Sequence, residues 1–253
     1  MKRTINLRNL AFAALVALIA AGGYSQNHNS NPERYFLNDD KVPSSLTILM
    51  CPPDTASARF AYDREQYEWG KSQRNTPRGR QAVTDANLNW YTDWVNDAFG
   101  EAFGSPITKK ENPELYKLVY NMQEDAGDLA TREAKQHYMR TRPFVFWNEP
   151  TATPDHEEGL RKNGSYPSGH TSIGWATALV LAEINPERAT EILKRGFEFG
   201  QSRVIVGAHY QSDVDAGRVA GAGIVAILHT DKGFQKQLDK AKKEFAKKNK
   251  KKK

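Results

Sequence analysis

The chain has 253 residues, of which 39 % are aliphatic or aromatic and 26 % are charged, and it contains one cysteine. This composition is too apolar for a disordered chain, and a single cysteine excludes an intramolecular disulfide or a cysteine-based zinc cluster. The length allows one domain with a full core, or two at most. The net charge of +6 and the pI ≈ 9.2 raise the question of a polyanionic partner.

The positive charge belongs to the two ends of the chain. Residues 1–25 contribute +3 and residues 231–253 contribute +8, whereas the body, residues 26–230, carries −5. A protein that grips nucleic acid more often carries positive charge on the folded surface that contacts phosphates. We therefore expect no nucleic-acid polymer as a partner.

The N-terminal end has the layout of a secretory signal peptide. Basic residues in 1–7 precede an apolar run over 10–21, and small residues follow it. A transmembrane anchor is the alternative, but a span needs about twenty apolar residues. We assign residues 1–25 to the signal peptide, with cleavage between about positions 21 and 25. Because the rest of the chain has no comparable run, the mature protein is predicted to be soluble and to be periplasmic or secreted by a bacterium.

The predicted elements of the body begin with an irregular segment over residues 26–59, which is polar and contains prolines. Asn112 followed by Pro113 is typical of a helix start. Apolar residues then recur at helical spacing, which predicts an amphipathic helix: Leu115, Leu118, Val119 and Met122. Residues 148–166, with prolines and glycines, predict a loop.

Three more helices are predicted towards the C-terminus. Residues 175–184 are nearly all apolar, which indicates a central buried helix. Asn185 and Pro186 start the next helix, and Gly200 is its predicted end. Ser212 to Asp215 resembles a capping box before an apolar helix over 219–228. Strand patterns, repeats and linkers are scarce or missing, so we predict one all-α domain.

The last segment, residues 231–253, is rich in lysine. The simpler interpretation is a frayed, solvated helix end or a disordered tail. The alternative is a patch that binds anionic polymers of the cell envelope.

Three short segments contain polar residues that packing explains poorly. The first has Lys135 and Arg142-Pro143, the second is residues 164–171, and the third has Ser202-Arg203 followed by His209 and Asp213. In the second segment, Ser168 can cap the helix that follows, and Gly169 lets an anion approach the N–H groups at its start. Taken alone, an ordinary helix cap explains that segment equally well.

The third segment places a carboxylate one helical turn after a histidine. Asp213 can accept the Nδ1–H of His209, which leaves Nε2 available for chemistry. A surface pair is the alternative. Three cations complete the set, Lys135, Arg142 and Arg203, whose donors match phosphoryl oxygens. Each alone is better explained by an ion pair. Together with two histidines and no cluster of metal ligands, they favour metal-free phosphoryl transfer.

The order and spacing of these segments resemble the three-part signature of the superfamily of type-2 phosphatidic acid phosphatases and vanadium haloperoxidases. The flanking residues 70–86, 100–104, 164–171 and 200–219 are more specifically similar to the bacterial class A non-specific acid phosphatases. The resemblance covers roughly residues 45–228 and implies an all-α acid phosphatase domain, a helical bundle, over 26–230.

The resemblance also implies a role for each signature residue. His209 is the nucleophile that forms a phosphohistidine, Asp213 orients it, and His170 is the general acid and then the general base. The phosphoryl oxygens are bound by the side chains of Lys135, Arg142, Arg203 and Ser168 and by the N–H of Gly169. The implied enzyme hydrolyses small phosphomonoesters without metal or cofactor at acidic pH, allows phosphotransferase activity, and forms a homo-oligomer.

Two other functions stay open at this point. A haloperoxidase would use the same residues to hold vanadate, although the class A-like flanks and the chain length favour the phosphatase. A non-catalytic protein of the envelope would bind anions through the lysine-rich segment, but this leaves the complete signature unexplained.

Overall fold

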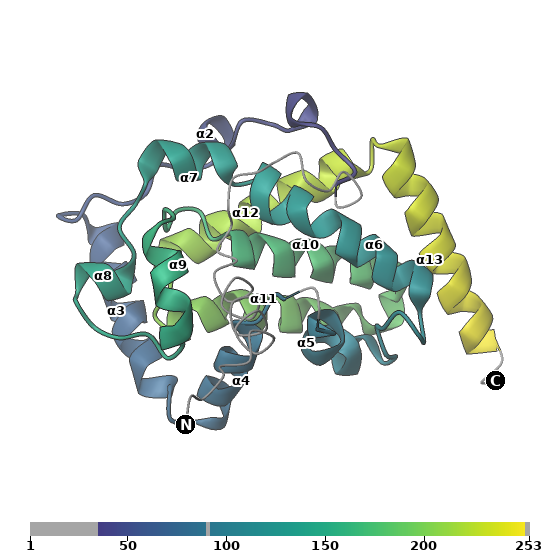
Figure 1. Cartoon of the computed structure of the whole chain (residues 1–253), viewed down its shortest axis with the longest axis horizontal. Coiled ribbons are helices and arrows are strands. Elements are labelled where there is room, and N and C mark those ends of the chain that lie inside the picture. The colour runs from purple at the N-terminus through teal and green to yellow at the C-terminus, as the bar shows by residue number, and fades with distance from the viewer. Residues whose placement is uncertain (1–34, 90–91, 251–253) are drawn as a thin grey trace, which may run out of the picture.

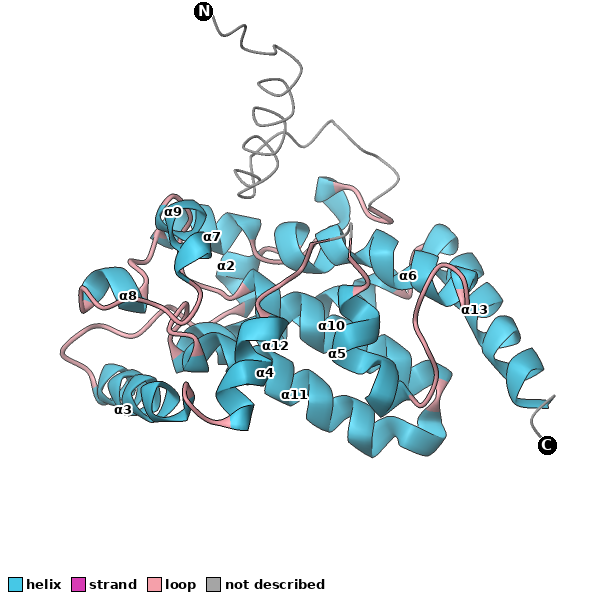
Figure 2. Cartoon of the chain, turned by 60° about the horizontal axis from the view of Figure 1, so that its bottom comes forward, coloured by secondary structure: helices cyan, strands magenta, loops and turns pink. Residues whose placement is uncertain are grey.

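The computed structural model describes residues 35–89 and 92–250, so the predicted signal peptide lies outside the described residues. Every regular element in these two ranges is a helix (Figure 2), which confirms the predicted all-α class. The longer helices are α3 (Ala58–Gln73), α4 (Pro77–Asp85), α5 (Trp94–Phe103), α6 (Pro113–Glu124), α7 (Arg132–Tyr138), α10 (Gly169–Ile184), α11 (Ala189–Ile205), α12 (Gln211–Leu228) and α13 (Lys232–Lys250). The short turns are η2 (Asp39–Lys41), α2 (Ser45–Ile48), η3 (Asp125–Leu129), α8 (Pro143–Phe146), η4 (Pro154–His156), α9 (Glu157–Arg161) and η5 (Pro186–Arg188).

The central element is α10, which packs along α11 on one side and along α12 on the other (Figure 1). Most of its residues are buried, and this confirms the central helix predicted over 175–184. The helix begins earlier than the apolar run, at Gly169, because the Ser168 hydroxyl accepts the N–H of Thr171 at 3.2 Å. The N-terminus of α10 is thereby fixed in the interior of the bundle.

The helix α6 starts at Pro113 after Asn112, as predicted, and its stripe of four apolar residues is buried. A single π-helical turn, η3, follows it. The carboxylate of Asp125 in this turn accepts the backbone N–H groups of Phe36 at 2.9 Å and Leu37 at 3.0 Å. This contact ties the described start of the chain to the core.

Two predicted helix boundaries are wrong. The helix α11 continues through Gly200 to Ile205. The glycine is there for close packing, since a Cβ at this position would lie 2.6 Å from Thr171 Cγ2 of α10. The helix α12 begins at Gln211, and its capping carboxylate is Asp213, which accepts the N–H of Tyr210 at 3.0 Å. Asp215 has no part in the cap, and it pairs with Arg218 at 2.8 Å.

The predicted loops contain short helices. The turn α2 and the start of α3 fall within 26–59, and η4 and α9 fall within 148–166. The carboxylate of Glu157, at the start of α9, accepts the N–H of Thr151 at 2.8 Å, which folds this segment back on itself. Between these short turns the backbone is irregular, as predicted.

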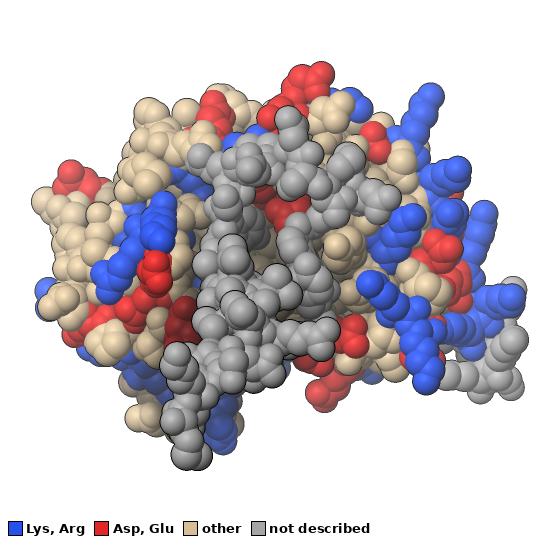
Figure 3. Space-filling model, in the orientation of Figure 1, with Lys and Arg blue, Asp and Glu red and all other residues tan. Residues whose placement is uncertain are grey.

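The lysine-rich segment was expected to be a frayed, solvated helix end or a disordered tail, and its described part is helical but packed on the body as the long helix α13. Its inner side packs against α6, and Phe234, Leu238 and Ala241 are buried there. Its lysines face outwards and gather at one end of the molecule (Figure 3). The packed body therefore extends beyond residue 230. In the described ranges, no helix is both long and apolar enough to cross a membrane.

Candidate active site

The structure brings the predicted site residues to the N-terminal end of α10. They come from the following places: Lys135 from α7, Arg142 from the residue before α8, Ser168, Gly169 and His170 from the start of α10, Arg203 from α11, and His209 and Asp213 from the start of α12. Most of them are deeply buried, with His209 only 3 % exposed and Asp213 fully covered. Residues far apart in sequence thus share one buried site.

His209 is held at both ring nitrogens. Its Nε2 lies 3.0 Å from Nη1 of Arg142, and its Nδ1 lies 3.3 Å from Oδ2 of Asp213. A guanidinium can only donate hydrogen bonds, so Nε2 must present its lone pair and Nδ1 must carry the proton. Burial and the charge of Arg142 lower the pKa of His209 well below its usual value, which favours this neutral form. The ring therefore has the tautomer that a nucleophilic Nε2 requires.

Asp213 contacts three further groups besides His209. Its Oδ2 accepts the hydroxyl of Ser165 at 2.5 Å in addition to the N–H of Tyr210, and its Oδ1 accepts Nη1 of Arg140 at 2.6 Å. Although burial opposes the charged form, Arg140 and these hydrogen bonds hold the pKa of Asp213 well below its usual range. The carboxylate next to His209 is therefore ionised.

Arg140 is one of the residues that sequence reasoning missed. It bridges two buried carboxylates, because its Nη2 also donates to Asp63 Oδ2 at 2.8 Å. Asp63 in turn accepts the N–H and the hydroxyl of Ser212, at 2.8 and 2.6 Å. The Arg140 guanidinium also lies over the ring of Tyr210, 3.9 Å from its centre. Asp213, Arg140 and Asp63 therefore form a connected series of buried charged groups next to His209.

A pattern in the sequence could have identified Asp63. The buried residues of α3 are Phe60, Asp63, Tyr67 and Gly70, which follow helical spacing. A carboxylate at a core position of such a stripe needs a buried partner. That partner, Arg140, lies 77 positions away in the sequence, so no local pattern around Asp63 predicts it. Ser165 lies inside the recognised 164–171 segment, but helix capping and spacing give it no role there.

Two of the predicted cations are held by backbone carbonyls. Arg142 donates to the carbonyls of Leu160 at 2.8 Å, Asn163 at 3.0 Å and Ala208 at 3.1 Å. Lys135 Nζ donates to those of Pro167 at 2.6 Å and Gly164 at 3.1 Å. Carbonyls orient these groups but do not neutralise them.

The cations depress one another's pKa values. Burial and the charge of Arg142 lower the pKa of Lys135 to about 7. Burial and the charge of Arg203 lower the pKa of Arg142 to about 9. Arg203, itself only 3 % exposed, also lowers the pKa of Lys135. Arg142 and Arg203, which are buried, and Lys135, which is half-buried, therefore lie close together with too little negative charge among them. An anion of double charge would correct this imbalance.

The start of α10 supplies donors to the same place. The Ser168 hydroxyl accepts hydrogen bonds from the N–H of Thr171 at 3.2 Å and from its hydroxyl at 2.9 Å, so its own proton remains for a ligand. The first N–H groups of a helix, here from Gly169 onwards, have no intrahelical acceptor. They carry partial positive charge and favour anions.

His170 is oriented differently from His209. Its Nε2 lies 2.5 Å from the backbone carbonyl of Asp85, and its ring stacks on Phe199 with centres 4.9 Å apart and planes within 13°. A carbonyl only accepts hydrogen bonds, so Nε2 carries a proton. This leaves Nδ1 as the ring nitrogen available for proton transfer. Burial and the charge of Arg203 lower the pKa of His170 well below its usual value. An anion in the site would raise it again.

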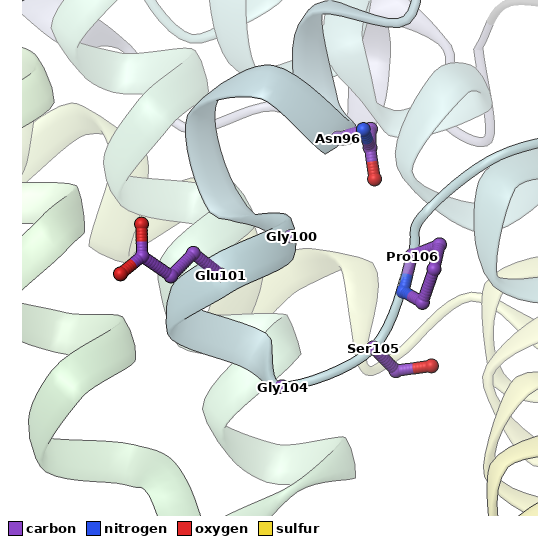
Figure 4. A pocket seen from close by; sticks show the side chains of 6 residues that line it. All are labelled: Asn96, Gly100, Glu101, Gly104, Ser105 and Pro106. Atoms are coloured by element: carbon purple, nitrogen blue, oxygen red, sulfur yellow. The ribbon is translucent and has the colours of Figure 1, made fainter.

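A separate pocket of about 300 Å³ lies at α5 and the turn that follows it, lined by Asn96, Gly100, Glu101, Gly104, Ser105 and Pro106. None of the predicted site residues lines it. Figure 4 shows the side chains of Asn96, Ser105 and Pro106 on one side of α5 and that of Glu101 on the other. No group of three His, Cys, Asp or Glu side chains in residues 35–89 and 92–250 is arranged to hold a metal ion.

The arrangement around His209 offers hydrogen-bond donors for a phosphoryl group and a nitrogen lone pair that can attack phosphorus. It also offers a second histidine that can exchange a proton with a leaving group or with water.

Comparison with known proteins identifies the family of the chain. Residues 126–236 match the PAP2 superfamily. A non-specific acid phosphatase of Providencia stuartii is 56 % identical over 86 % of this chain and 87 % of its own length, and one of Salmonella typhimurium is 45 % identical over 85 % of both. An acid phosphatase of Zymomonas mobilis is 36 % identical over 95 % of this chain and 90 % of its own. The chain therefore belongs to the PAP2 superfamily and, within it, to the bacterial non-specific acid phosphatases, a group of hydrolases.

Proposed function

We propose that this chain is an exported acid phosphatase that hydrolyses phosphate monoesters through a phosphohistidine on His209, without a metal ion. The observation that carries the proposal is the arrangement of His209, whose Nε2 lone pair faces a phosphate-binding arginine while its Nδ1 faces an ionised carboxylate. The relatives are named non-specific acid phosphatases, which supports a broad range of small phosphomonoesters. Export rests on the signal-peptide pattern of residues 1–25.

The first step transfers the phosphoryl group to the enzyme. The phosphoryl oxygens of the substrate replace His209 as the partner of Arg142. Lys135 and Arg203 also bind these oxygens and neutralise their negative charge. The Nε2 lone pair then forms the P–N bond as the P–O bond to the leaving group breaks. The electron pair of that bond goes to the leaving oxygen, which takes a proton from His170. Asp213 stabilises the cationic phosphoimidazole that results.

The second step returns the enzyme to its starting state. His170, now neutral, accepts a proton from water while the water oxygen forms a bond to phosphorus and the P–N bond breaks. The electron pair returns to Nε2 of His209, and inorganic phosphate leaves. An alcohol can take the place of water, in which case the product is a new phosphate ester.

The experiment that tests the proposal traps the intermediate. The enzyme is mixed with a phosphate ester carrying labelled phosphorus and quenched in alkali, because phosphohistidine survives alkali and hydrolyses in acid. We expect label on wild type and none on His209→Ala. The matched control is His137→Ala, an exposed histidine outside the site, which should be labelled like wild type.

Two further measurements address metal independence. Activity in excess EDTA should equal activity without it, because Lys135, Arg142 and Arg203 provide the charge that a metal ion would otherwise supply. Loss of activity in EDTA with recovery on zinc addition would contradict the metal-free mechanism. Label retained by His209→Ala would contradict the assigned nucleophile.

A further inference from the structure

The C-terminal end of α4 forms a contact with the active site that the phosphatase signature does not include. Asp85 is the last residue of α4, and its carbonyl accepts the Nε2–H of His170 at 2.5 Å. The last carbonyls of a helix have no intrahelical donor and carry partial negative charge. The bond thus satisfies one of them and places that partial charge against the imidazole ring.

The side chain of Asp85 fixes the position of this carbonyl. It is 3 % exposed, and its two oxygens are occupied by Arg195 Nη2 and by the Ser202 hydroxyl at 2.5 Å, both from α11. Arg78 of α4 donates to the same hydroxyl at 2.9 Å. Arg195 is held in turn by the carbonyl of Ala98 at 2.8 Å. The end of α4 is therefore locked to α11 by a buried ion pair and its hydrogen bonds.

The same helix α11 holds the ring of His170 from its face. Phe199 stacks on it, and this is possible because Gly174, one turn further along α10, has no side chain. A Cβ at Gly174 would lie 2.2 Å from the Phe199 ring. The ring plane is thus set by Phe199 and the rotation within that plane by the Asp85 carbonyl.

We propose that Asp85 is the positioning residue of the general acid: its anchored carbonyl keeps the proton on Nε2 of His170 and makes Nδ1 the atom that gives and takes protons. This inference rests on the proposed function, since it assigns atoms within that mechanism. In the imidazolium, Nδ1–H donates to the leaving oxygen. In the neutral ring that remains, the Nδ1 lone pair accepts a proton from water. Nε2–H stays bonded to Asp85 in both states, so the ring need not rotate between the two steps.

The test uses the dependence of the rate on the leaving group. A nitrophenolate leaves as an anion without protonation, whereas an alkoxide must be protonated as it leaves. A defect in the general acid therefore slows alkyl phosphates selectively. A defect in the nucleophile slows both, because His209 must attack either substrate. The parameter is kcat/KM, which reports steps up to formation of the phosphoenzyme.

Asp85→Asn is compared with Asp63→Asn, the same substitution in a buried carboxylate that pairs with an arginine behind His209. We expect Asp85→Asn to lose on the order of 100-fold on an alkyl phosphate and less than about threefold on p-nitrophenyl phosphate. Asp63→Asn should lose the same factor on both. Ser202→Ala, which removes one of the two anchors, should show a smaller loss of the same selective kind.

The outcomes separate this inference from the proposed function. Equal losses on both substrates in Asp85→Asn and Ser202→Ala, or no loss in either, would overturn the positioning role while wild type still forms a labelled phosphohistidine. Failure of wild type to form that intermediate would instead overturn the proposed function. If Asp85→Asn does not fold, as judged by thermal unfolding, Ser202→Ala gives the result alone.

Discussion

The two histidines of the site are held by opposite nitrogens and by groups of different charge. His209 gives Nδ1–H to the carboxylate of Asp213, and Arg140 links that carboxylate to a second one, Asp63. His170 gives Nε2–H to a neutral carbonyl, that of Asp85, whose own carboxylate is engaged by Arg195 instead. In each case a buried ion pair between an arginine and an aspartate stands behind the group that orients the ring.

The difference matches the demands of the two roles. A histidine that carries a phosphoryl group is a cation for the lifetime of the intermediate, and a full negative charge beside it lowers the energy of that state. A histidine that shuttles a proton must release it as readily as it accepts it, and a full charge would hold the proton too strongly. A helix-terminal carbonyl exerts a weaker pull. The kind of partner is therefore consistent with the role that we propose for each ring.

The largest effect should come from removing the charge on the nucleophile's side. Asp213→Asn replaces an acceptor by an amide that can donate to Nδ1, which moves the ring proton to Nε2 and abolishes the lone pair that attacks. We expect kcat to fall about 10³- to 10⁴-fold, equally for aryl and alkyl phosphates. Steady-state kinetics on both substrates measure it.

The control is Asp215→Asn, an exposed carboxylate two residues further along α12, where kcat should stay within about twofold of wild type. A loss in Asp213→Asn that depended on the leaving group would show that Asp213 acts through proton transfer to the substrate. It would remove the distinction between the two halves of the site.

A smaller effect is expected on the proton-shuttling side. In His170→Ala, p-nitrophenyl phosphate should still phosphorylate His209, because its leaving group needs no proton. Water then lacks a base, so the phosphoenzyme should accumulate towards one label per chain, and steady turnover should fall on the order of 100-fold. A rapid-quench time course measures the initial burst and the slow phase.

Here the control is His156→Ala, a histidine close enough to lower the pKa of His170 but without a role in the mechanism. It should show neither a burst nor accumulation. Slow turnover of His170→Ala without a labelled intermediate would mean that phosphorylation, not hydrolysis, had lost its catalyst.

The sequence was informative about the fold where one pattern had one cause: the apolar stripe after Asn112 and Pro113 predicted α6, and the apolar run over 175–184 predicted the buried part of α10. It misled where one residue has two uses. Gly200 was expected to end a helix, but it permits the close crossing of α11 and α10. The cap of α12 falls on Asp213, because the same carboxylate accepts both a backbone N–H and the His209 ring. In the lysine-rich segment, the many lysines drew attention away from the few apolar residues, such as Phe234, that pack α13 against the body.

The candidate site divides in the same way. The residues that would touch a phosphoryl group lie in three short segments, and their spacing identified them. The residues behind them do not: Asp63 contacts Ser212 across 149 positions, and Asp85 contacts Arg195 across 110. Such pairs are set by how helices pack, so only the folded chain places them together. Sequence spacing therefore predicted residues that the fold brings together in one site, and not the residues that hold them in place.

The smallest of the expected effects concerns the cations that both histidines share. Burial and Arg142 lower the pKa of Lys135 to about 7 in the ligand-free protein. A lysine with a lowered pKa is cationic below that value and neutral above it, so affinity for a dianion should fall as the pH rises through it. Sulfate keeps its charge over this range, and its competitive inhibition constant should rise up to about tenfold between about pH 6 and about pH 8.

The substitution Lys135→Arg separates this lysine from the histidines. Arginine stays charged throughout the range, so the inhibition constant should become nearly independent of pH, even if geometry makes binding weaker overall. Lys162→Arg, an exposed lysine paired with Glu158, should keep the wild-type profile. Arg142, with its pKa at about 9, remains charged below about pH 8 and contributes little to the slope. A profile that persisted in Lys135→Arg would assign the titration to His170 or His209 instead of the lysine.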